Sequence, residues 1–315
     1  MPERTADLWW LFTRQTLCVT QEESVVNAAL LMQRRNFRHL PVISSSSKKI
    51  VGIISAQDVI DSLALINHAD ASDEAILRSL EIPVHRIMSL HPIVVEKGDG
   101  LTEVVKKLVS HNIGALPVVD ERGLVQGIIT LRDLVGLLGT DSEPMGLSVS
   151  EVMTEHIITI NPDSWISDAV HRMSESRIRR LPVVDAGTPS SPTAKGVLTN
   201  KDVLRLLAKA AIKDRDSGRE HRSESTSLFQ MKVSECMTAE AISVDSSDDV
   251  RIAASRMMIF GIGGLTVLCS TSKREMCGLV TERDLVKKIC KARSVNFIVE
   301  AMKFELEVKE ASFSN

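Results

Sequence analysis

The chain has 315 residues, enough for two domains with sizeable cores, and its 43% hydrophobic and 25% charged residues are ordinary for a soluble globular protein. A net charge of −3 provides no broad basic face for a polyanion, and only 3% aromatic residues argue against a surface that stacks nucleic-acid bases. No apolar run is long enough to span a membrane, and the first residues do not begin a signal peptide. We therefore expect a soluble, cytoplasmic protein that binds neither membranes nor nucleic acid.

Cysteine usage points to a reducing compartment. The five cysteines have no CxxC spacing and no nearby His pairing, and their number is odd. These features favour reduced thiols over a disulfide framework or a metal site. Cys269 and Cys277 are the one pair that could face each other, across a predicted hairpin.

Residues 1–12 form an N-terminal segment that contains the densest aromatic cluster of the chain, Leu8-Trp9-Trp10-Leu11-Phe12. Such a segment can pack on the domain that follows it. It can also bind a partner, because exposed aromatic side chains mark interfaces. The sequence leaves both interpretations open.

From residue 13 to residue 66 the pattern predicts a strand, a helix, two strands joined by a turn, and a second helix. Residues 24–36 have apolar side chains along one helical face, and residues 44–49 form a polar hairpin loop. The same order of elements returns three times, which makes internal repetition the basis of the architecture. The predicted segments are repeat 1 at 13–66, a helical connector at 67–82, repeat 2 at 83–139, repeat 3 at 147–208, a solvated linker at 209–230, repeat 4 at 231–293 and a tail at 294–315.

Every repeat contains a Gly, a short apolar run, a Ser or Thr, and an Asp three residues later. The plain interpretation is a helix capping box with Asp in place of Glu. The functional interpretation is that N–H groups at a helix start favour phosphate, while a nearby carboxylate accepts hydrogen bonds from ribose hydroxyls. The candidate nucleotide-binding residues of this motif are Ser55, Asp58, Thr130, Asp133, Thr199, Asp202, Thr281 and Asp284.

An aliphatic residue ends the first predicted strand of each repeat. These residues, with their neighbours, are expected to offer backbone and apolar surface to a base. They are Val19, Val95, Ile160 and Val244.

A pair of residues just before the Leu-Pro step, or its equivalent, alternates in character along the chain. Repeats 1 and 3 have basic pairs, and repeats 2 and 4 have Gly114-Ala115 and Gly263-Gly264. Arg can bind a phosphate through two hydrogen bonds, so unequal sites are expected, with at most two or three binding tightly. The alternative is that surface residues of repeats diverge freely. The predicted phosphate-binding residues are Arg38, His39, Arg179 and Arg180.

A short segment, called here the prelude, precedes the first strand of repeats 3 and 4, and no such segment is evident before repeat 1. Residues 297–303 echo a prelude and are followed by a strand-like alternation at 304–308. If the two chain ends approach each other, this tail can lie beside repeat 1 and bury apolar side chains. The alternative is a disordered tail.

The preludes Val-Ser-Glu-Val-Met-Thr (149–154) and Val-Ser-Glu-Cys-Met-Thr (233–238), Arg-Leu-Pro-Val-Val-Asp (180–185) and the four Gly-to-Asp motifs together resemble the CBS domain, named after cystathionine β-synthase. The resemblance covers about residues 13–293. It implies an α+β fold of four tandem β-α-β-β-α repeats that pair into two Bateman modules with nucleotide clefts, a flat disk being one arrangement of the modules. The four-repeat organisation is similar to the gamma subunit of AMP-activated protein kinase and its prokaryotic relatives. In that family, residues matching Arg38, His39, Arg179 and Arg180 line the phosphates.

No nucleophile motif, metal-ligand spacing, Walker A loop or dinucleotide-binding glycine pattern occurs in the sequence. We therefore expect a protein that is not an enzyme, that requires no cofactor or metal, and that binds AMP, ADP or ATP as a regulatory ligand. Binding would change the module arrangement or the contact with a protein partner or a second copy. One alternative is a scaffold with vestigial clefts, and another is a binder of a different adenosyl ligand such as S-adenosylmethionine.

Overall fold

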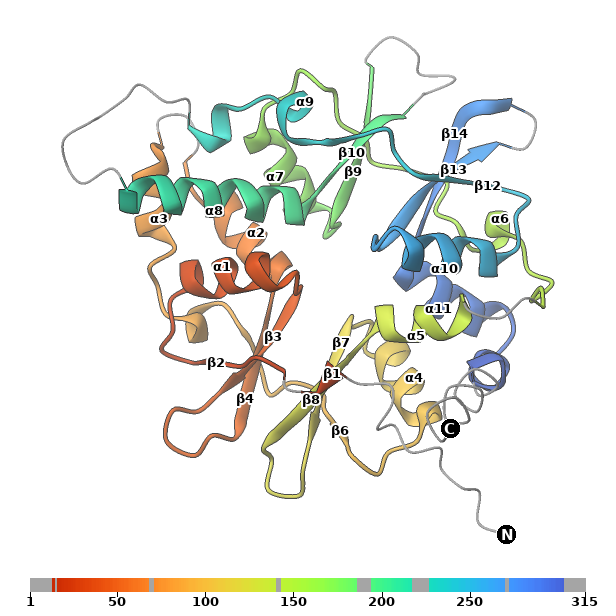
Figure 1. The fold of residues 1–315 in the computed structure, drawn as a ribbon, viewed down its shortest axis with the longest axis horizontal. Helices are drawn as coiled ribbons and strands as arrows, with labels where there is room; N and C mark the ends of the chain where they lie inside the picture. Colours follow the sequence, from red (N-terminus) through yellow and green to blue (C-terminus); the bar gives the residue numbers. More distant parts are fainter. Residues whose placement is uncertain are drawn as a thin grey trace. The chain divides into compact units, whose positions relative to one another are not determined.

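The computed structural model describes residues 13–14, 16–67, 71–139, 143–185, 194–216, 227–269 and 272–302. Within these ranges the chain forms four repeats, each with a small sheet and the order strand, helix, strand, strand, helix, except that a single bridge residue takes the place of the first strand in repeat 3 (Figure 1). The predicted α+β class and the repeat order are confirmed. The N-terminal aromatic cluster and the strand-like segment 304–308 lie outside the described residues.

The first half of the chain contains repeats 1 and 2. Repeat 1 consists of β2 (Val19–Thr20), α1 (Val25–Arg35), β3 (His39–Ile43), β4 (Ile50–Ser55) and α2 (Ala56–Ala64). The segment between the repeats holds α3 (Asp73–Ser79), the 3-10 turn η2 (Val84–Arg86) and β5 (Ser89–Leu90). Repeat 2 consists of β6 (Val95–Glu96), α4 (Leu101–Ser110), β7 (Ala115–Val119), β8 (Val125–Thr130) and α5 (Leu131–Leu138).

The second half contains repeats 3 and 4. Repeat 3 has the prelude helix α6 (Val149–Val152), then α7 (Ile166–Glu175), β9 (Arg180–Val184), β10 (Ala194–Thr199) and α8 (Asn200–Asp216), with Ile160 bridging to β9 in place of a first strand. Repeat 4 has the 3-10 turn η3 (Leu228–Gln230), α9 (Val233–Cys236) and β11 (Thr238–Ala239) before its core elements. Those core elements are β12 (Ser243–Asp245), α10 (Val250–Ile259), β13 (Gly264–Cys269), β14 (Ser272–Thr281) and α11 (Glu282–Ala292).

Local signals explain the helix boundaries. Ser24 caps α1 by accepting a hydrogen bond from the Asn27 N–H, and Asn36 ends the helix in the left-handed conformation at φ 57°. Asn tolerates this conformation better than most residues, which makes it a favourable C-terminal residue. The predicted apolar face of α1 is buried, with Met32 at 0% exposure.

The described chain divides into two compact units. Unit 1 contains residues 1–16, 93–157 and 242–315, and therefore holds repeats 2 and 4; unit 2 contains residues 17–92 and 158–241, and therefore holds repeats 1 and 3. In unit 2, α2 packs on α7 and α1 packs on α8; in unit 1, α5 packs on α10 and α11. Each unit has its own buried aliphatic core.

Each prelude joins a repeat other than the one it precedes. β1 (Thr13–Arg14), before repeat 1, pairs with β8 of repeat 2, and β5, before repeat 2, pairs with β4 of repeat 1. Likewise β11, before repeat 4, pairs with β10 of repeat 3, and Thr154, before repeat 3, bridges to Leu279 of repeat 4. The exchange is reciprocal between repeats 1 and 2 and between repeats 3 and 4. The prediction that repeat 1 lacks a prelude is wrong, because β1 fills that place.

The exchange explains the Gly at the start of three of the motifs, Gly52, Gly196 and Gly278. A side chain at Gly196 would overlap the backbone carbonyl oxygen of Thr238 in β11, and one at Gly278 would overlap the Met153 sulfur. Only a residue without a Cβ lets the incoming prelude approach the strand this closely.

The structure describes part of the predicted tail and both ends of the predicted linker. The described part of the tail packs with repeats 2 and 4: residues 295–302 are helical, and Ile298, Val299 and Met302 are buried in the core of unit 1. The linker predicted at 209–230 is too long at both ends. Helix α8 continues to Asp216 with Ala210 and Ala211 buried, and Leu228 and Phe229 are core residues at the other end. No helix of the described residues is long and apolar enough to cross a membrane.

Replacing Gly196 by Ala should destabilise unit 2 by about 1–3 kcal/mol, because the new methyl group must push β11 away from β10. Gly98→Ala is the matched control, since nothing lies within 4 Å of its new Cβ, and its effect should stay within about 1 kcal/mol. Urea denaturation measures both. Equal midpoints for the two variants would contradict the close approach of the exchanged prelude.

Candidate functional site

The Ser/Thr and Asp of all four motifs form capping boxes at the start of the second helix of each repeat. The backbone N–H of the Ser or Thr donates to Oδ2 of the Asp three residues later. The four distances are 2.6 Å for Ser55–Asp58, 2.7 Å for Thr130–Asp133, 2.8 Å for Thr199–Asp202 and 3.0 Å for Thr281–Asp284. The plain interpretation of the motif is therefore correct in every repeat, and the functional one depends on the second oxygen, Oδ1.

The second oxygen divides the four motifs into two classes. Asp202 Oδ1 accepts from Arg205 Nη2 at 2.7 Å, and Asp284 Oδ1 lies 3.2 Å from Lys288 Nζ. Among the described residues, nothing hydrogen-bonds Oδ1 of Asp58 or Asp133. The carboxylates of repeats 1 and 2 thus retain an acceptor for a ligand, whereas those of repeats 3 and 4 hold a cation from their own helix.

Burial raises the pKa of Asp58 and of Asp133, and this effect exceeds the opposing hydrogen bonds from Ser55 and Thr130. A desolvated carboxylate gains more from a new hydrogen-bond donor than a solvated one does. Oδ1 of Asp58 and of Asp133 can therefore accept a hydrogen bond from a hydroxyl group, and burial makes that hydrogen bond more favourable.

The residue pair before each Leu-Pro step lies at the start of the second helix. The carbonyl oxygen of its first residue accepts from the residue after the helix cap, at 2.9 Å for Arg38–Ala56 and 3.0 Å for Arg179–Asn200. Its second residue lies opposite the capping residue in the hairpin, as His39 does opposite Ser55. Arg180 lies opposite Thr199 in the same way, and the small residues of repeats 2 and 4 occupy the matching places.

The basic pairs do not alternate between the compact units. Repeats 1 and 3 share unit 2, so Arg38, His39, Arg179 and Arg180 all lie there, and both small-residue pairs lie in unit 1. The charge of Arg179 lowers the pKa of Asp58, against the larger effect of burial, so Arg179 of repeat 3 lies near the carboxylate of repeat 1. The basic pairs and the small-residue pairs, which alternate along the sequence, therefore lie in different compact units.

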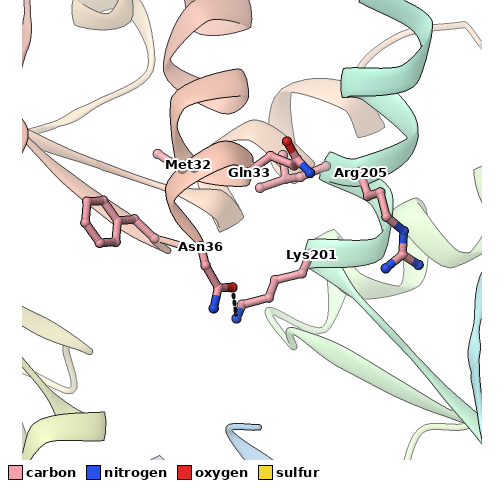
Figure 2. Close-up of a pocket in the computed structure, with 7 residues that line it drawn as sticks. Met32, Gln33, Asn36, Lys201 and Arg205 are labelled. Carbon is pink, nitrogen blue, oxygen red and sulfur yellow. Dashed lines mark hydrogen bonds between the residues drawn. The ribbon is translucent and has the colours of Figure 1, made fainter. Parts of the chain in front are cut away.

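A small hollow lies between α1 and α8 in unit 2. It has a volume of about 140 Å³, and Figure 2 shows Asn36 and Lys201 reaching toward each other beside it, joined by a 2.6 Å hydrogen bond. Its walls contain two cations and no carboxylate. The lining residues are Met32, Gln33, Asn36, Phe37, Lys201, Leu204 and Arg205.

The sequence interpretation missed the residues one position before the motif Asp. Arg132 donates from Nε to Glu282 Oε1 at 2.9 Å across the repeat 2–repeat 4 interface, and Lys201 borders the hollow of unit 2. Aligning the four motifs would have found them, because this position is basic in three repeats: Arg132, Lys201 and Arg283.

The four strand-end residues predicted to meet a base are core residues. Val19, Val95, Ile160 and Val244 are between 0% and 6% exposed and belong to the two aliphatic cores. Their contact with a base, through backbone and apolar surface and together with their neighbours, stays a prediction.

All five cysteines are free thiols. Burial raises the pKa of Cys290 to about 11, and burial together with the neighbouring Cys269 thiol raises the pKa of Cys277 to about 11. Both groups are therefore protonated at neutral pH and unreactive as nucleophiles. No cluster of metal-binding side chains occurs among the residues that the structure describes.

Four segments of the chain match the profile of one known protein domain. The profile of the CBS domain matches residues 7–65, 84–139, 149–209 and 233–291. The chain belongs to the CBS domain family. The predicted family and its four repeats are confirmed.

Relatives of this CBS protein span nearly its whole length. The 33.4 kDa ribosomal RNA operon protein of Thermofilum pendens is 28% identical over 290 residues, which are 90% of this chain and 92% of that protein. The crystal structure of protein MJ1225 from Methanocaldococcus jannaschii, described as a candidate archaeal homologue of g-AMPK, matches with a TM-score of 0.74 at 23% identity and covers 90% and 99% of the two chains. A conserved protein from Pyrococcus horikoshii matches with a TM-score of 0.56 at 20% identity, covering 88% and 96%. Both structures share the fold of this CBS protein.

Asp58 and Asp133 should titrate above the ordinary Asp value of about 3.9. Between that value and the raised pKa, the folded state holds more protons than the unfolded state, so these two groups make stability fall as pH rises through that window. Titration of the carboxyl carbons by ¹³C NMR measures both, with Asp58→Asn and Asp133→Asn assigning the signals. Titration of both groups at or below about 3.9 would contradict their desolvation.

Proposed function

We propose that this CBS protein is a regulatory protein that binds an adenine nucleotide, such as AMP, ADP or ATP, without turning it over. The observation that carries the proposal is Asp58. One of its oxygens is fixed by the helix cap, the other has no hydrogen-bond partner among the described residues, and Arg179 of repeat 3 lies near enough to lower its pKa. A carboxylate acceptor beside a guanidinium suits a molecule with both sugar hydroxyls and a phosphate.

The chemistry of each end of the ligand follows from the residues present. The ribose hydroxyls would donate to Oδ1 of Asp58, as they do to acidic residues in other nucleotide sites. The phosphate would be attracted by Arg179 and by the positive end of the α2 helix dipole at Ser55. Arg38, His39 and Arg180 lie in the same unit and would add positive charge.

The four motifs should not bind equally. At Asp202 and Asp284 a ribose hydroxyl would have to displace Arg205 or Lys288, so binding there costs an existing ion pair. At Asp58 and Asp133 it would replace only solvent. We therefore expect the first two repeats to supply the tighter sites, whereas the basic pairs alone favour repeats 1 and 3.

Regulation follows if the ligand contacts both repeats of a unit. Asp58 belongs to repeat 1 and Arg179 to repeat 3, and α2 packs directly on α7 between them. A nucleotide held by both residues would favour one packing of these helices over others, and a ligand shifts an equilibrium by its difference in affinity for the two states. A protein partner or a second copy of the chain would sense that change.

Isothermal titration calorimetry with AMP, ADP, ATP and S-adenosylmethionine tests the proposal. Asp58→Asn keeps a carbonyl oxygen for the helix cap and replaces the open acceptor by a donor, so it should weaken nucleotide binding by about 1–3 kcal/mol. Asp163→Asn is the matched control, because it makes the same charge change on an exposed loop residue and should leave binding unchanged.

The result that would refute nucleotide binding is the absence of heat for all four ligands with folded protein. Heat for S-adenosylmethionine alone would replace the adenine nucleotides by that adenosyl ligand. Equal binding by wild type and Asp58→Asn would remove Asp58 from the site.

A further inference from the structure

The two open carboxylates differ in the charge that the sister repeat contributes. Burial raises the pKa of Asp58, the charge of Asp61 of the same repeat adds to this effect, and the charge of Arg179 of repeat 3 opposes it. Asp133 in unit 1 lies near Glu282 of repeat 4, whose charge adds to the effect of burial in raising the pKa of Asp133. The sister repeat thus provides a cation at one site and an anion at the other.

Glu282 is a buried carboxylate with a fixed partner. Its side chain is 5% exposed, and its Oε1 accepts from Arg132 Nε at 2.9 Å. Its backbone N–H donates to the Gly263 carbonyl oxygen at 3.2 Å, which fixes the residue at the start of α11. Arg132, the cation next in sequence to Asp133, is therefore already bound to an internal anion.

Unit 2 carries neutral residues at the two matching positions, Gln57 for Arg132 and Asn200 for Glu282. Gln57 donates to Asp61 Oδ1 at 3.0 Å, and its own buried carbonyl oxygen has no partner among the described residues. The Asn200 N–H donates to the Arg179 carbonyl oxygen at 3.0 Å, so these two residues are in contact through their backbones. No internal carboxylate occupies the place that Glu282 takes in unit 1.

We propose that Glu282 is a specificity residue that keeps phosphate out of unit 1 by occupying Arg132, so that unit 1 takes an adenosine ligand of low negative charge and unit 2 takes the phosphate-bearing nucleotide. This inference rests on the proposed function and adds the ligand class of each unit.

The physical reason is competition between two anions for one cation. A phosphate that takes Arg132 Nε must displace the Glu282 carboxylate, which then loses a charged hydrogen bond while it remains buried, a costly change. A phosphate that leaves the pair intact meets the charge of Glu282 at short range. Ribose hydroxyls meet neither obstacle, because they donate to the open Oδ1 of Asp133.

The first test measures binding by unit 1 in the full chain. The substitution Asp58→Asn weakens the site of unit 2, and calorimetry then uses ATP, AMP and adenosine as probes. This protein should bind adenosine more tightly than ATP. Adding Glu282→Gln should raise the ATP affinity by about tenfold or more, the effect of removing one nearby unit charge, and change the adenosine affinity by less than about twofold. Glu121→Gln, an exposed position in the same unit, is the matched control and should change neither affinity.

The second test installs the anion in unit 2 and does not depend on the stability of the Glu282 variant. In the full chain carrying Asp133→Asn, Asn200→Glu places a carboxylate beside Arg179 and should lower the ATP affinity by about tenfold or more without the same loss for adenosine. Asn200→Gln is the neutral control of the same size. Circular dichroism confirms folding of every variant before titration.

The outcomes separate this inference from the proposed function. If the wild-type protein binds none of the three probes, nucleotide binding itself is refuted. If it binds them, but the Asp58→Asn and Asp133→Asn proteins have the same ratio of ATP to adenosine affinity, the division by charge is refuted and nucleotide binding stands. An unchanged ratio in Asn200→Glu likewise overturns the role assigned to an anion at this position.

Discussion

The hydrogen bond from the capping Ser or Thr to the Asp three residues later is the interaction on which each repeat depends. It fixes the start of the second helix at N–O distances of 2.6 to 3.0 Å in the four repeats. It uses only one carboxylate oxygen, so the same residue that stabilises the helix can also face a ligand. What distinguishes the four repeats is the other oxygen, which has no hydrogen-bond donor among the described residues at Asp58 and Asp133 and meets a cation of the same helix at Asp202 and Asp284.

Strand exchange and helix packing join different pairs of repeats. Each prelude leaves its own repeat and pairs with the sheet of another, and successive repeats fall in different compact units. Repeats 1 and 3 pack through their helices, as do repeats 2 and 4. The basic and small-residue pairs, which alternate along the sequence, therefore lie in different units, and the unit with the small-residue pairs also holds the Arg132–Glu282 ion pair.

Short-range features of this fold could be predicted from the sequence. The helix at residues 24–36, its Ser24 and Asn36 ends and the four capping boxes depend on residues within four positions of each other, so the local pattern determines them. The four-fold repetition strengthened each local interpretation, because a motif found in register in four places is not an accident.

Long-range features could not be predicted in this way. The exchange of preludes and the Arg132–Glu282 contact join residues far apart, 150 positions in the latter case, and neither leaves a periodic signal. The linker was overestimated because α8 continues into a polar stretch, where Ala210 and Ala211 are buried by packing and not by a strong apolar pattern. The packing of Ile298 and Met302 in the core of unit 1 joins them to residues of repeat 2 far away in the sequence, and the sequence contains no signal for that contact.

The central claim is that a capping-box carboxylate serves as the ribose acceptor. A crystal structure of the protein grown with AMP tests it most directly. We predict a ribose hydroxyl within hydrogen-bond distance of Asp58 Oδ1, with the helix cap to Ser55 intact and the phosphate directed toward Arg179. A bound AMP whose ribose contacts none of the four motif carboxylates would contradict the account.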